Sequence, residues 1–504
     1  MQTSADHTID YKALYEQQKV VIEQLQLHIK LLTHQLDNLK KLVYGSKHER
    51  FIPTSGNPAQ LALDIESEKV DAVKISSAKR IEYTRVQTEV VKKEHPGRQK
   101  IAEHLERREI VLAPTEDITG TRRIGEEVTE ELEYEPGKLF VNRFVRPKYV
   151  KPGNEGFIIA PMPERPLPKA IAGPGLLAQI VIDKYVDHLP LNRQQERFKR
   201  EGVNIPYNTI TDWVSATCAL IRPVYEALVK TVLQSKYLHV DETPVPVLDK
   251  DKKGSTHRGY FWVYHNSLEG LVFFDYRQGR GRDGPKQVLE GFSGFLQTDG
   301  YSVYDIFKKQ EGITVLHCMA HARRMFFESL DSDADRAHYA LERFSELYNI
   351  ERSAKDQQLS QEDLLQRRQS QAVPLLEQFE RWMKQEYTSG QVLPKSPIGK
   401  AIAYSLQRWK ELALYTTDGK LNIDNNPVER SIRPTALGRK NYLFAGSHEA
   451  AQRSAMLYSL LGTCKLHDIN PFIYLRDVLQ RIAMHPINQI QELLPQNWQL
   501  LSNN

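Results

Sequence analysis

The hydrophobic and polar positions follow different periods along the chain, and each period predicts a different kind of element. In residues 11–44, mostly apolar residues recur at alternating intervals of four and three positions, and no Gly or Pro interrupts the pattern before Gly45. This heptad period predicts a self-associating coiled coil, dimeric or higher. The alternative is an amphipathic helix packed on its own domain. The seam positions are Tyr11, Tyr15, Gln18, Ile22, Leu25, Ile29, Leu32, Leu36, Leu39 and Val43.

The next two segments lack helical periodicity. Residues 45–80 mix Ser, Gly, Pro and charged residues without a period, which predicts a linker. Residues 81–168 contain segments rich in β-branched and aromatic residues, at 81–91 and 138–150, and predict a small β-containing domain. Scattered basic residues there are typical of a solvated face, with contact to a DNA backbone as the alternative. They are Lys92, Lys93, Arg98, Lys100, Arg107 and Arg108.

Residues 169–235 show helical spacing in three pieces separated by prolines, at 173–189, 191–203 and 207–221. Asn208 or Thr209 is the expected N-cap of the third helix. A helix, a short turn and a helix with a polar start are what a helix-turn-helix segment needs to place side chains in a major groove. Helical trios also occur in proteins that do not bind DNA, so the spacing leaves both interpretations open.

From residue 236 the pattern becomes α/β. Three strands in close succession, followed by alternating strands and helices, are the order of an RNase H-like sheet. A charged, almost wholly helical stretch at about 333–414 interrupts this predicted domain, which spans 236–445, and 446–504 is again helical. We therefore expect a multidomain protein with an RNase H-like core. The predicted strands are 237–248, 259–266, 271–277, 294–300 and 313–319, and the predicted helices among them are 284–292, 301–310 and 320–330.

Composition adds little to this picture. The 504 residues predict roughly two to four domains. Charged residues make up 26% and hydrophobic residues 40%, which is ordinary for a globular protein. The net charge of +4 is only weakly basic, so it permits nucleic-acid binding through local patches without arguing for it.

The cysteines and the apolar segments give information on the cellular compartment of the protein. Cys218, Cys318 and Cys464 lie far apart and form no CxxC pair, which argues against a thiolate zinc site and fits a reducing compartment. The first residues are polar, without the apolar core of a signal peptide. No apolar run reaches the length of a membrane span. We expect a cytoplasmic protein with no membrane partner.

Two acids lie where a metal site would need them. Metal-dependent phosphoryl transfer requires carboxylates on rigid elements, and Mg²⁺ prefers oxygen ligands. Asp241 follows the apolar run YLHV, and Asp299 ends the run GFLQT. The alternatives are a strand-end cap for Asp241 and a turn residue for Asp299, while Glu242 would point to the other face. An RNase H-like order puts the first and fourth strands side by side, which would bring Asp241 and Asp299 together.

A third acid, Glu429, lies in the polar stretch LNIDNNPVERSIRP at 421–434. With Asn426 as N-cap and Pro427 as the first helical residue, Glu429 would complete a capping box. A metal ligand beside basic residues would instead suit a polyanionic substrate, and the two roles are compatible. The capping box alone leaves four neighbours unexplained, namely Asp424, Asn425, Arg430 and Arg433.

Five motifs resemble the catalytic motifs of the insertion-sequence-66 family of bacterial DDE transposases: HVDET, LQTDGYSVY, HCMAHARRMF, DNNPVERSIRP and GRKNYLFAGS. The heptad segment followed by YGSKHERF resembles the family's leucine zipper. Residues 176–214 resemble its helix-turn-helix segment. The resemblance covers nearly the whole chain.

The resemblance implies a DNA transposase that cuts DNA and transfers strands. Asp241, Asp299 and Glu429 would be the catalytic triad and would hold Mg²⁺ or Mn²⁺. DNA would be the partner, with a second copy of the chain joined through 11–44 and accessory proteins encoded by the same element. His321 equally fits a satisfied core histidine. Roles on phosphates or the DNA backbone would fall to Arg430, Arg433, Arg439, Lys440, Asn441, His321, Arg323 and Arg324.

The chain departs from the family in one respect. The family often carries a cysteine-rich zinc module between the zipper and the helix-turn-helix, and residues 124–150 resemble the polypeptide around that module. Its cysteines are absent here, so no zinc is expected. Two other functions remain: a domesticated, non-catalytic DNA-binding regulator, and an RNase H-like nuclease without strand transfer. The intact set of three acids argues against the regulator, and the heptad segment argues for pairing of DNA ends.

Overall fold

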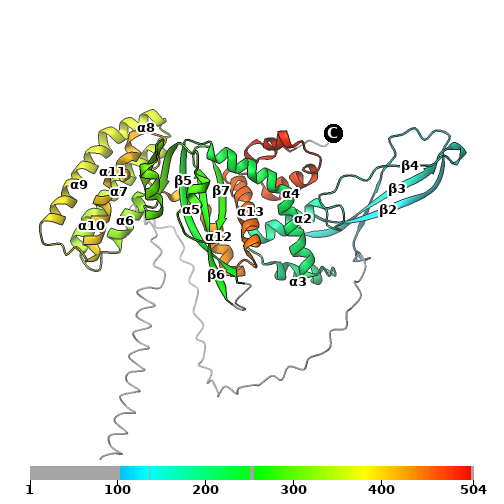
Figure 1. Cartoon of the computed structure of the whole chain (residues 1–504), viewed down its shortest axis with the longest axis horizontal. Helices are drawn as coiled ribbons and strands as arrows, with labels where there is room; N and C mark the ends of the chain where they lie inside the picture. The colour runs from blue at the N-terminus through cyan, green and yellow to red at the C-terminus, as the bar shows by residue number, and fades with distance from the viewer. Residues whose placement is uncertain (1–100, 102, 136, 250–254, 501–504) are drawn as a thin grey trace, which may run out of the picture. The chain divides into compact units, whose positions relative to one another are not determined.

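A computed structural model describes every residue except 1–100, 102, 136, 250–254 and 501–504. The predicted coiled coil, the linker and the predicted strand at 81–91 therefore lie outside the described residues. All described residues belong to one unit, Lys93–Asn504, drawn in colour in Figure 1. Among the described helices, none combines the length and the apolar composition that a membrane span requires.

Residues 107–159 form a four-stranded sheet that we call the β arm. Its central strand, β3 (Lys138–Val150), pairs with the parallel strand β1 (Arg107–Val111) and the antiparallel strand β2 (Arg122–Glu135). The short strand β4 (Phe157–Ile159) pairs with the end of β3, after the single turn η1 (Pro152–Asn154). The β-branched segment predicted at 138–150 is the whole of β3, so the expectation of strands is confirmed here.

The base of the β arm joins the helix α2 (Pro174–Tyr185) through a buried carboxylate. Oε1 of Glu133 accepts hydrogen bonds from the backbone N–H of Leu176 (3.0 Å) and of Tyr134 (2.9 Å). A Cβ atom at Gly173 or Gly175 would come within 2.5 Å of this carboxylate, and at Gly175 it would also come within 2.7 Å of the backbone oxygen of Tyr134, so Gly175 requires glycine. The carboxylate thus satisfies an N–H group at the start of α2, as a helix N-terminus requires.

Three helices follow where the sequence predicts them: α2, α3 (Leu191–Arg200) and α4 (Tyr207–Leu233). The predicted cap was wrong, because the N-cap of α4 is Pro206 and makes no side-chain cap bond. The helix also continues through Pro223 beyond its predicted end. Its later turns bury apolar side chains at helical spacing, and this packing offsets the missing N–H of the proline. These side chains are Ile221, Val224, Leu228 and Val232.

A five-stranded sheet forms the centre of the molecule, with the strand order β7-β6-β5-β8-β9. The strands β5, β6 and β7 are antiparallel, whereas β5, β8 and β9 are parallel. The strands that come first and fourth along the chain, β5 and β8, are therefore neighbours in the sheet, as the sequence predicts. The bounds are β5 (Tyr237–Leu248), β6 (Thr256–Asn266), β7 (Leu271–Arg277), β8 (Gly294–Thr298) and β9 (Ile313–His317).

Short helices connect these strands: α5 (Asp283–Val288), η2 (Ser302–Lys309) and α6 (Met319–Phe327). The segment predicted as helical at 301–310 is a 3₁₀ helix rather than an α-helix. The helix predicted at 284–292 ends earlier, at Val288. Both connections are brief, so tertiary packing of Val303, Phe307 and Leu289 decides their geometry more than helix propensity does.

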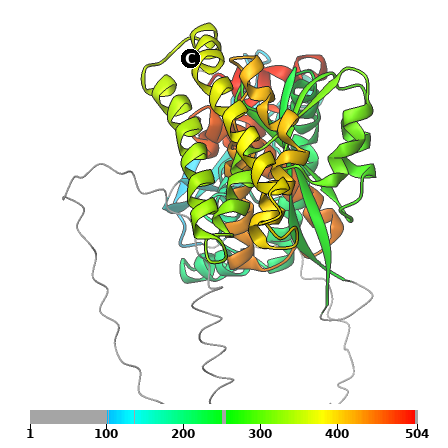
Figure 2. The ribbon, with the colours of Figure 1, turned by 90° about the vertical axis from the view of Figure 1, so that its left-hand side faces the viewer.

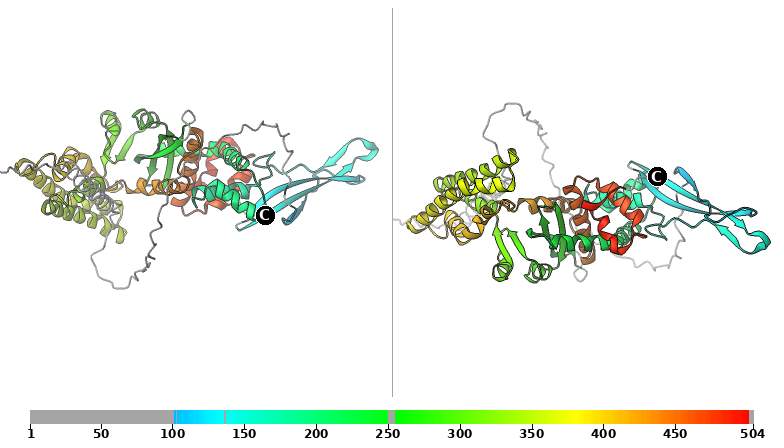
Figure 3. Two further views of the ribbon diagram at one scale, coloured as in Figure 1. Left: turned by 90° about the horizontal axis from the view of Figure 1, so that it is seen from below. Right: turned by 90° about the horizontal axis from the view of Figure 1, so that it is seen from above.

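The outer edge of the central sheet is closed by side chains. Among the described residues no strand pairs with the far side of β7, and the helix α13 (His448–Leu466) packs against it (labelled in Figure 1; Figure 3 gives two further views). The Ser459 hydroxyl accepts from the N–H of Phe274 (2.8 Å), and the Thr463 hydroxyl bonds both the N–H and the C=O of Val272 (3.3 and 3.2 Å). Unpaired edge groups are thereby satisfied without another strand.

Residues 334–417 are helical, where the sequence predicts a helical insertion, and Figure 2 views these helices face on. They have a core of their own around Phe344, Phe379 and Trp409, which also packs against Leu316 of β9. The elements are α7 (Ala334–Asp356), α8 (Gln361–Arg367), the π-turn η3 (Arg368–Ala372), α9 (Val373–Thr388), α10 (Pro397–Gln407), α11 (Trp409–Ala413) and η4 (Leu414–Thr417).

After the helical insertion the chain returns to the central sheet as α12 (Asn426–Tyr442), which packs against β5 and β6. The tail adds α13, α14 (Pro471–Arg481), η5 (Ile487–Leu493) and η6 (Pro495–Asn497), so the predicted helical tail is confirmed.

Candidate functional site

Asp241 lies within β5, and Asp299 directly follows the neighbouring parallel strand β8. The last pair of the β5–β8 register is His239 with Gln297, and each acid follows two residues later in the chain, with Asp299 just beyond the end of β8. Asp241 therefore leaves the same face of the sheet as His239, and Asp299 begins the turn at the adjoining strand end. Asp241 is inside β5, opposite Val263 of β6, so the alternative of a strand-end cap was wrong.

Electrostatics agrees with this placement. Burial raises the pKa of Asp241 well above its usual value, and the negative charges of Asp299, Glu242 and Glu429 raise it further. Carboxylates that share a site raise one another's pKa in this way. A cation placed among them would remove this repulsion.

Asp299 also makes the local turn that its sequence predicts. Its Oδ1 accepts from the N–H of Tyr301 (2.8 Å), and Gly300 has a φ of +87°. The helical insertion fixes this turn, because the Tyr404 hydroxyl donates to the carbonyl of Asp299 (2.9 Å) and Arg408 donates to that of Gly300 (3.3 Å). The two interpretations of Asp299, a turn residue and a candidate metal ligand, are thus compatible.

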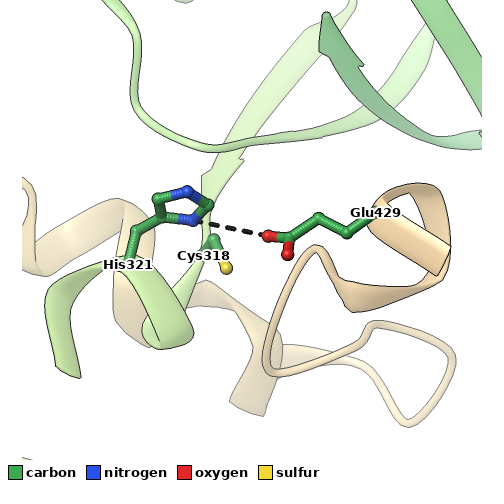
Figure 4. Close-up of side chains that lie close together, drawn as sticks. All are labelled: Cys318, His321 and Glu429. Atoms are coloured by element: carbon green, nitrogen blue, oxygen red, sulfur yellow. Dashed lines mark ion pairs between the residues drawn. The ribbon is translucent and has the colours of Figure 1, made fainter. Parts of the chain in front are cut away.

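Glu429 is not a capping residue. The N-cap of α12 is Asn425, and the N–H of Asn426, which the capping box assigned to Glu429, donates to Asp424 instead (3.0 Å). The Glu429 carboxylate points toward His321, with 3.8 Å between Oε1 and Nδ1 (Figure 4). Within the described residues neither of these two atoms has a hydrogen-bond partner, although both are shielded from solvent. The carboxylate is therefore available to a ligand.

Cys318 completes a small cluster that sequence reasoning missed. Its sulfur, a nitrogen of His321 and an oxygen of Glu429 lie within 4.8 Å of one another (Figure 4). The Cys318 sulfur accepts from the N–H of Asn425 (3.1 Å), and burial raises the pKa of the thiol. A protonated, hydrogen-bonded thiol is a poor ligand for a hard cation, so Cys318 serves here to hold the start of α12.

A buried hydrogen-bond network positions the three acids. Asn425 donates from Nδ2 to the carbonyl of Val240 (3.0 Å), next to Asp241, and its Oδ1 accepts from Nδ1 of His239 (3.0 Å). The carbonyl of Asn425 accepts from the N–H of Glu429 (3.4 Å). Asn425 therefore connects the strand of Asp241 directly to the helix of Glu429.

The rest of this network extends to the strand of Asp299. Nε2 of His239 accepts from Asn422 (3.0 Å), and the carbonyl of Asn422 accepts from Gln297 (3.0 Å), two residues before Asp299. Burial lowers the pKa of His239 to about 3, so the imidazole is neutral. A neutral ring donates from one nitrogen and accepts at the other, as both bonds require. Sequence reasoning left Asn425 unexplained and gave no signal for His239.

Glu242 lies beside Asp241 but has other partners. Arg280 donates to it from Nε (2.8 Å), and the hydroxyl of Tyr304 donates to its second oxygen (2.8 Å). The Arg280 guanidinium also stacks over the ring of Tyr301, 4.0 Å from the centroid. With its charge balanced by Arg280, Glu242 holds the loop after β7 rather than joining the three acids.

The basic residues proposed for DNA fall into two groups. Arg430, Arg433 and Lys440 on α12 and Arg324 on α6 are exposed. Arg439 instead donates to the carbonyl of Pro244 in β5, and Asn441 donates to the carbonyl of Leu437 in its own helix (3.2 Å). Arg323 and His321 are half-buried. The exposed side chains are accessible to an external anion, whereas Arg439 forms its hydrogen bond within the protein.

A cavity of about 540 Å³ adjoins the start of α12. Glu351 and Lys355 of α7, Arg368 of η3, and Asp424 and Arg430 line part of it. The buried Arg368 donates from Nε and Nη2 to the two carboxylate oxygens of Glu351, and from its terminal groups to the carbonyls of Tyr415, Asp418 and Leu421. This arginine ties the helical insertion to the segment that leads to Glu429.

Comparisons with known proteins agree with this arrangement. Sequence profiles of transposases match three parts of the chain: "Transposase IS66 family" at 169–453, "IS66 C-terminal element" at 459–496, and "Transposase C of IS166 homeodomain" at 31–110. The protein is thus a transposase, a protein that acts on DNA. It belongs to the IS66 family, whose main profile covers more than half of its length.

Relatives from Sinorhizobium fredii (strain NBRC 101917 / NGR234) match along nearly the entire chain. The uncharacterized protein y4hP is 33% identical over 93% of this chain and 88% of its own length. The uncharacterized protein y4qI is 31% identical over 95% of this chain and 91% of its own length. The shared segment therefore includes the central sheet, the helical insertion and the tail.

Proposed function

We propose that the protein catalyses metal-dependent DNA cleavage and strand transfer with Asp241, Asp299 and Glu429 as its three acids. The observation that carries the proposal is that the charges of Asp299 and Glu429 both act on Asp241, supported by the parallel pairing of β5 with β8 and by the hydrogen bonds of Asn425 to the strand of Asp241 and to the helix of Glu429. The strand order β7-β6-β5-β8-β9, three antiparallel strands followed by two parallel ones, supports assignment of an RNase H-like core.

The residues fit a hard divalent cation such as Mg²⁺ or Mn²⁺. All three donors are carboxylates, the ligands that these ions prefer. The raised pKa of Asp241 reflects mutual repulsion of the acids, which a cation would relieve. One or two bound cations would supply Lewis-acid stabilisation and lower the pKa of the attacking water or 3′-hydroxyl.

In this proposal the protein's own residues position the three acids and neutralise the charge of the DNA phosphates. Asn425 and His239 hold the three acids on a rigid frame, since their hydrogen bonds are buried and fully directed. The exposed Arg430, Arg433 and Lys440 supply positive charge for DNA phosphates along α12. Because the acids are held in place before DNA binds, they need not be rearranged during the reaction.

The remaining parts of the proposal concern assembly. Residues 11–44 would join two or more copies as a coiled coil, since joining two DNA ends requires at least two active sites. Helices α2, α3 and α4 would contribute a helix-turn-helix for end recognition. Accessory proteins of the same element complete the proposed set of partners.

The test uses a supercoiled plasmid that carries the DNA flanking this gene. Wild-type protein with Mg²⁺ or Mn²⁺ is expected to release the segment and to yield strand-transfer products, whereas Asp241→Asn binds the DNA ends without cutting. Cleavage without strand transfer would indicate a nuclease. Binding without cleavage by the wild type would indicate a regulator and would reject the proposal.

A further inference from the structure

The exposed face of α12 carries a regular stripe of side chains. Arg430, Arg433, Leu437 and Lys440 recur at intervals of three and four, so they share one face of the helix, and all four are exposed. Within the part of the chain that the structure describes, the three cations of this stripe have no ion pair with an acid. The stripe begins beside Glu429 and runs away from it.

The stripe ends in an apolar pair held in an unusual backbone. Leu443 is the C-cap of α12 and has a φ of +61° and a ψ of −49°, the geometry of a γ-turn, in which the positive φ is strained for a leucine. Its side chain is 63% exposed, and that of Phe444 is 40% exposed. A leucine here strains the backbone and leaves apolar surface in water, so neither feature favours folding.

The pair is held firmly rather than in a loose loop. The N–H of Leu443 donates to the carbonyl of Arg439 (3.0 Å) and that of Phe444 to Tyr442 (2.6 Å). The next residue, Ala445, exchanges two backbone hydrogen bonds of 2.8 Å with Pro246 and Leu248 at the end of β5. The turn therefore presents Leu443 and Phe444 at a fixed place relative to β5.

We propose that Leu443 and Phe444 form a wedge that unstacks bases of the bound DNA, while Arg430, Arg433 and Lys440 hold the adjoining phosphates. This inference rests on the proposed function and adds a second contact to the same substrate. Apolar side chains flanked by cations are the means by which proteins insert between base steps and kink a duplex. The charge of the stripe favours a polyanion as the occupant rather than another apolar protein surface.

The geometry sets where the distortion falls. Leu443 follows Glu429 by 14 residues, which corresponds to about 21 Å along a helix. At roughly 3.4 Å per base pair, this distance is about six base steps. The wedge would therefore act on bases about six steps from the phosphate that the acids attack, and would bend the DNA on one side of the site.

The test measures base unstacking with the full chain and a short mixed-sequence duplex in which several adenines are replaced by 2-aminopurine. Fluorescence of this base rises when it leaves the stack. Wild-type protein is expected to raise it, and Phe444→Ala to abolish the rise and weaken binding about tenfold. Leu443→Gly is expected to reduce the signal while leaving the melting temperature unchanged or higher, because glycine relieves the strain of the positive φ.

Two control variants match the changes made. Asp468→Gly relieves another residue of positive φ (+54°) in the turn after α13, and Leu268→Ala removes an apolar side chain that is 46% exposed elsewhere. Both are expected to keep the fluorescence rise. The Asp241→Asn variant is expected to keep it too, so a failure of the catalytic proposal is distinguishable from a failure of the wedge.

Three results would overturn the inference. The first is a wild-type protein that binds the duplex without a fluorescence rise. The second is an unchanged rise with Leu443→Gly and Phe444→Ala. The third is a loss of self-association in these variants, measured by sedimentation, with DNA binding intact, which would assign the pair to contact between copies of the chain.

Discussion

The β arm and the central sheet both carry many acids, but they place them in opposite surroundings. In the β arm the acids pair with cations across exposed strands, as in Arg143–Glu109 and Arg108–Glu135. In the central sheet Asp241 is half-buried, and the charges that act on it come from three further acids. Exposed pairs contribute little to stability, whereas buried acids without a partner are strongly destabilising. The difference teaches that the acids of the β arm are compensated by cations within the fold, whereas Asp241 of the central sheet is surrounded by like charge.

The largest expected effect concerns Asp241. Asp241→Asn is expected to lower DNA cleavage by about 10³-fold or more, since one of three metal ligands is lost. The same variant is expected to melt at a higher temperature than metal-free wild type at pH 7, because burial and the neighbouring acids disfavour the ionised form of the Asp241 carboxyl group, which the amide of the variant cannot adopt. Calorimetry and plasmid cleavage measure the two effects. A lower melting temperature would give Asp241 a structural role and remove the contrast with the β arm.

The next effect concerns Asn425, which connects the acids. Asn425→Ala is expected to lower the free energy of unfolding by about 2 kcal/mol, because the carbonyl of Val240 and the ring of His239 lose their partners. Cleavage by the folded fraction is expected to fall about 10- to 100-fold, as for residues that orient metal ligands. A matched control is Asn266→Ala, which removes another fully buried asparagine of the same sheet, one that caps the turn before β7. Equal loss of cleavage in both variants would mean that Asn425 acts through stability alone.

A smaller effect is expected at the base of the β arm, where Glu133 departs from the exposed pattern. Burial raises its pKa to about 7, with Glu131 adding to the shift. The folded state therefore binds the proton more tightly than the unfolded state. The resulting stabilisation is full below pH 4.5 and is lost as the pH rises to about 7.

Chemical denaturation of Glu133→Gln as a function of pH tests this. Between pH 4.5 and 7 the wild type should lose up to about 3 kcal/mol relative to this variant. The exposed Glu126→Gln serves as control and should follow the wild type. Parallel curves for wild type and Glu133→Gln would show that Glu133 is charged in the folded protein throughout this range.

The smallest effect is expected for the exposed pairs of the β arm. Glu109→Gln removes the partner of Arg143, whose guanidinium lies 2.8 Å from the carboxylate. The free energy of unfolding should change by less than about 0.5 kcal/mol, and the change should shrink further in high salt. Urea titrations at two salt concentrations measure it. A change as large as that for Asn425→Ala would erase the distinction between the two sheets.

The sequence predicts the elements of the central sheet well. The segments 237–248 and 271–277 coincide with β5 and β7, because their apolar runs are long and bounded by polar turns. The pairing of the first and fourth strands followed from strand order. The catalytic triad remains a prediction, and what the structure adds is that the charges of Asp299 and Glu429 raise the pKa of Asp241.

Contacts between distant parts of the chain could not be predicted from the sequence. The bond between Asn425 and His239 spans 186 positions, and no local pattern signals it. The start of α12 was misassigned because the N–H of Asn426 donates to Asp424, and because the N–H of the true N-cap, Asn425, donates to Cys318 at the end of another strand. Local rules cannot weigh such partners, since only the folded chain brings them within reach.

The closure of β7 by α13 has a consequence for incomplete chains. A product that stops before Ser459 lacks both hydroxyl groups that satisfy Val272 and Phe274, and it leaves the apolar strand LVFFDYR with an open edge. Such an edge recruits strands from other chains. We expect truncated products to aggregate rather than persist as DNA-binding competitors of the full-length protein, which sedimentation of a chain ending at residue 458 would reveal. Helix α13 would then limit how long incomplete chains persist.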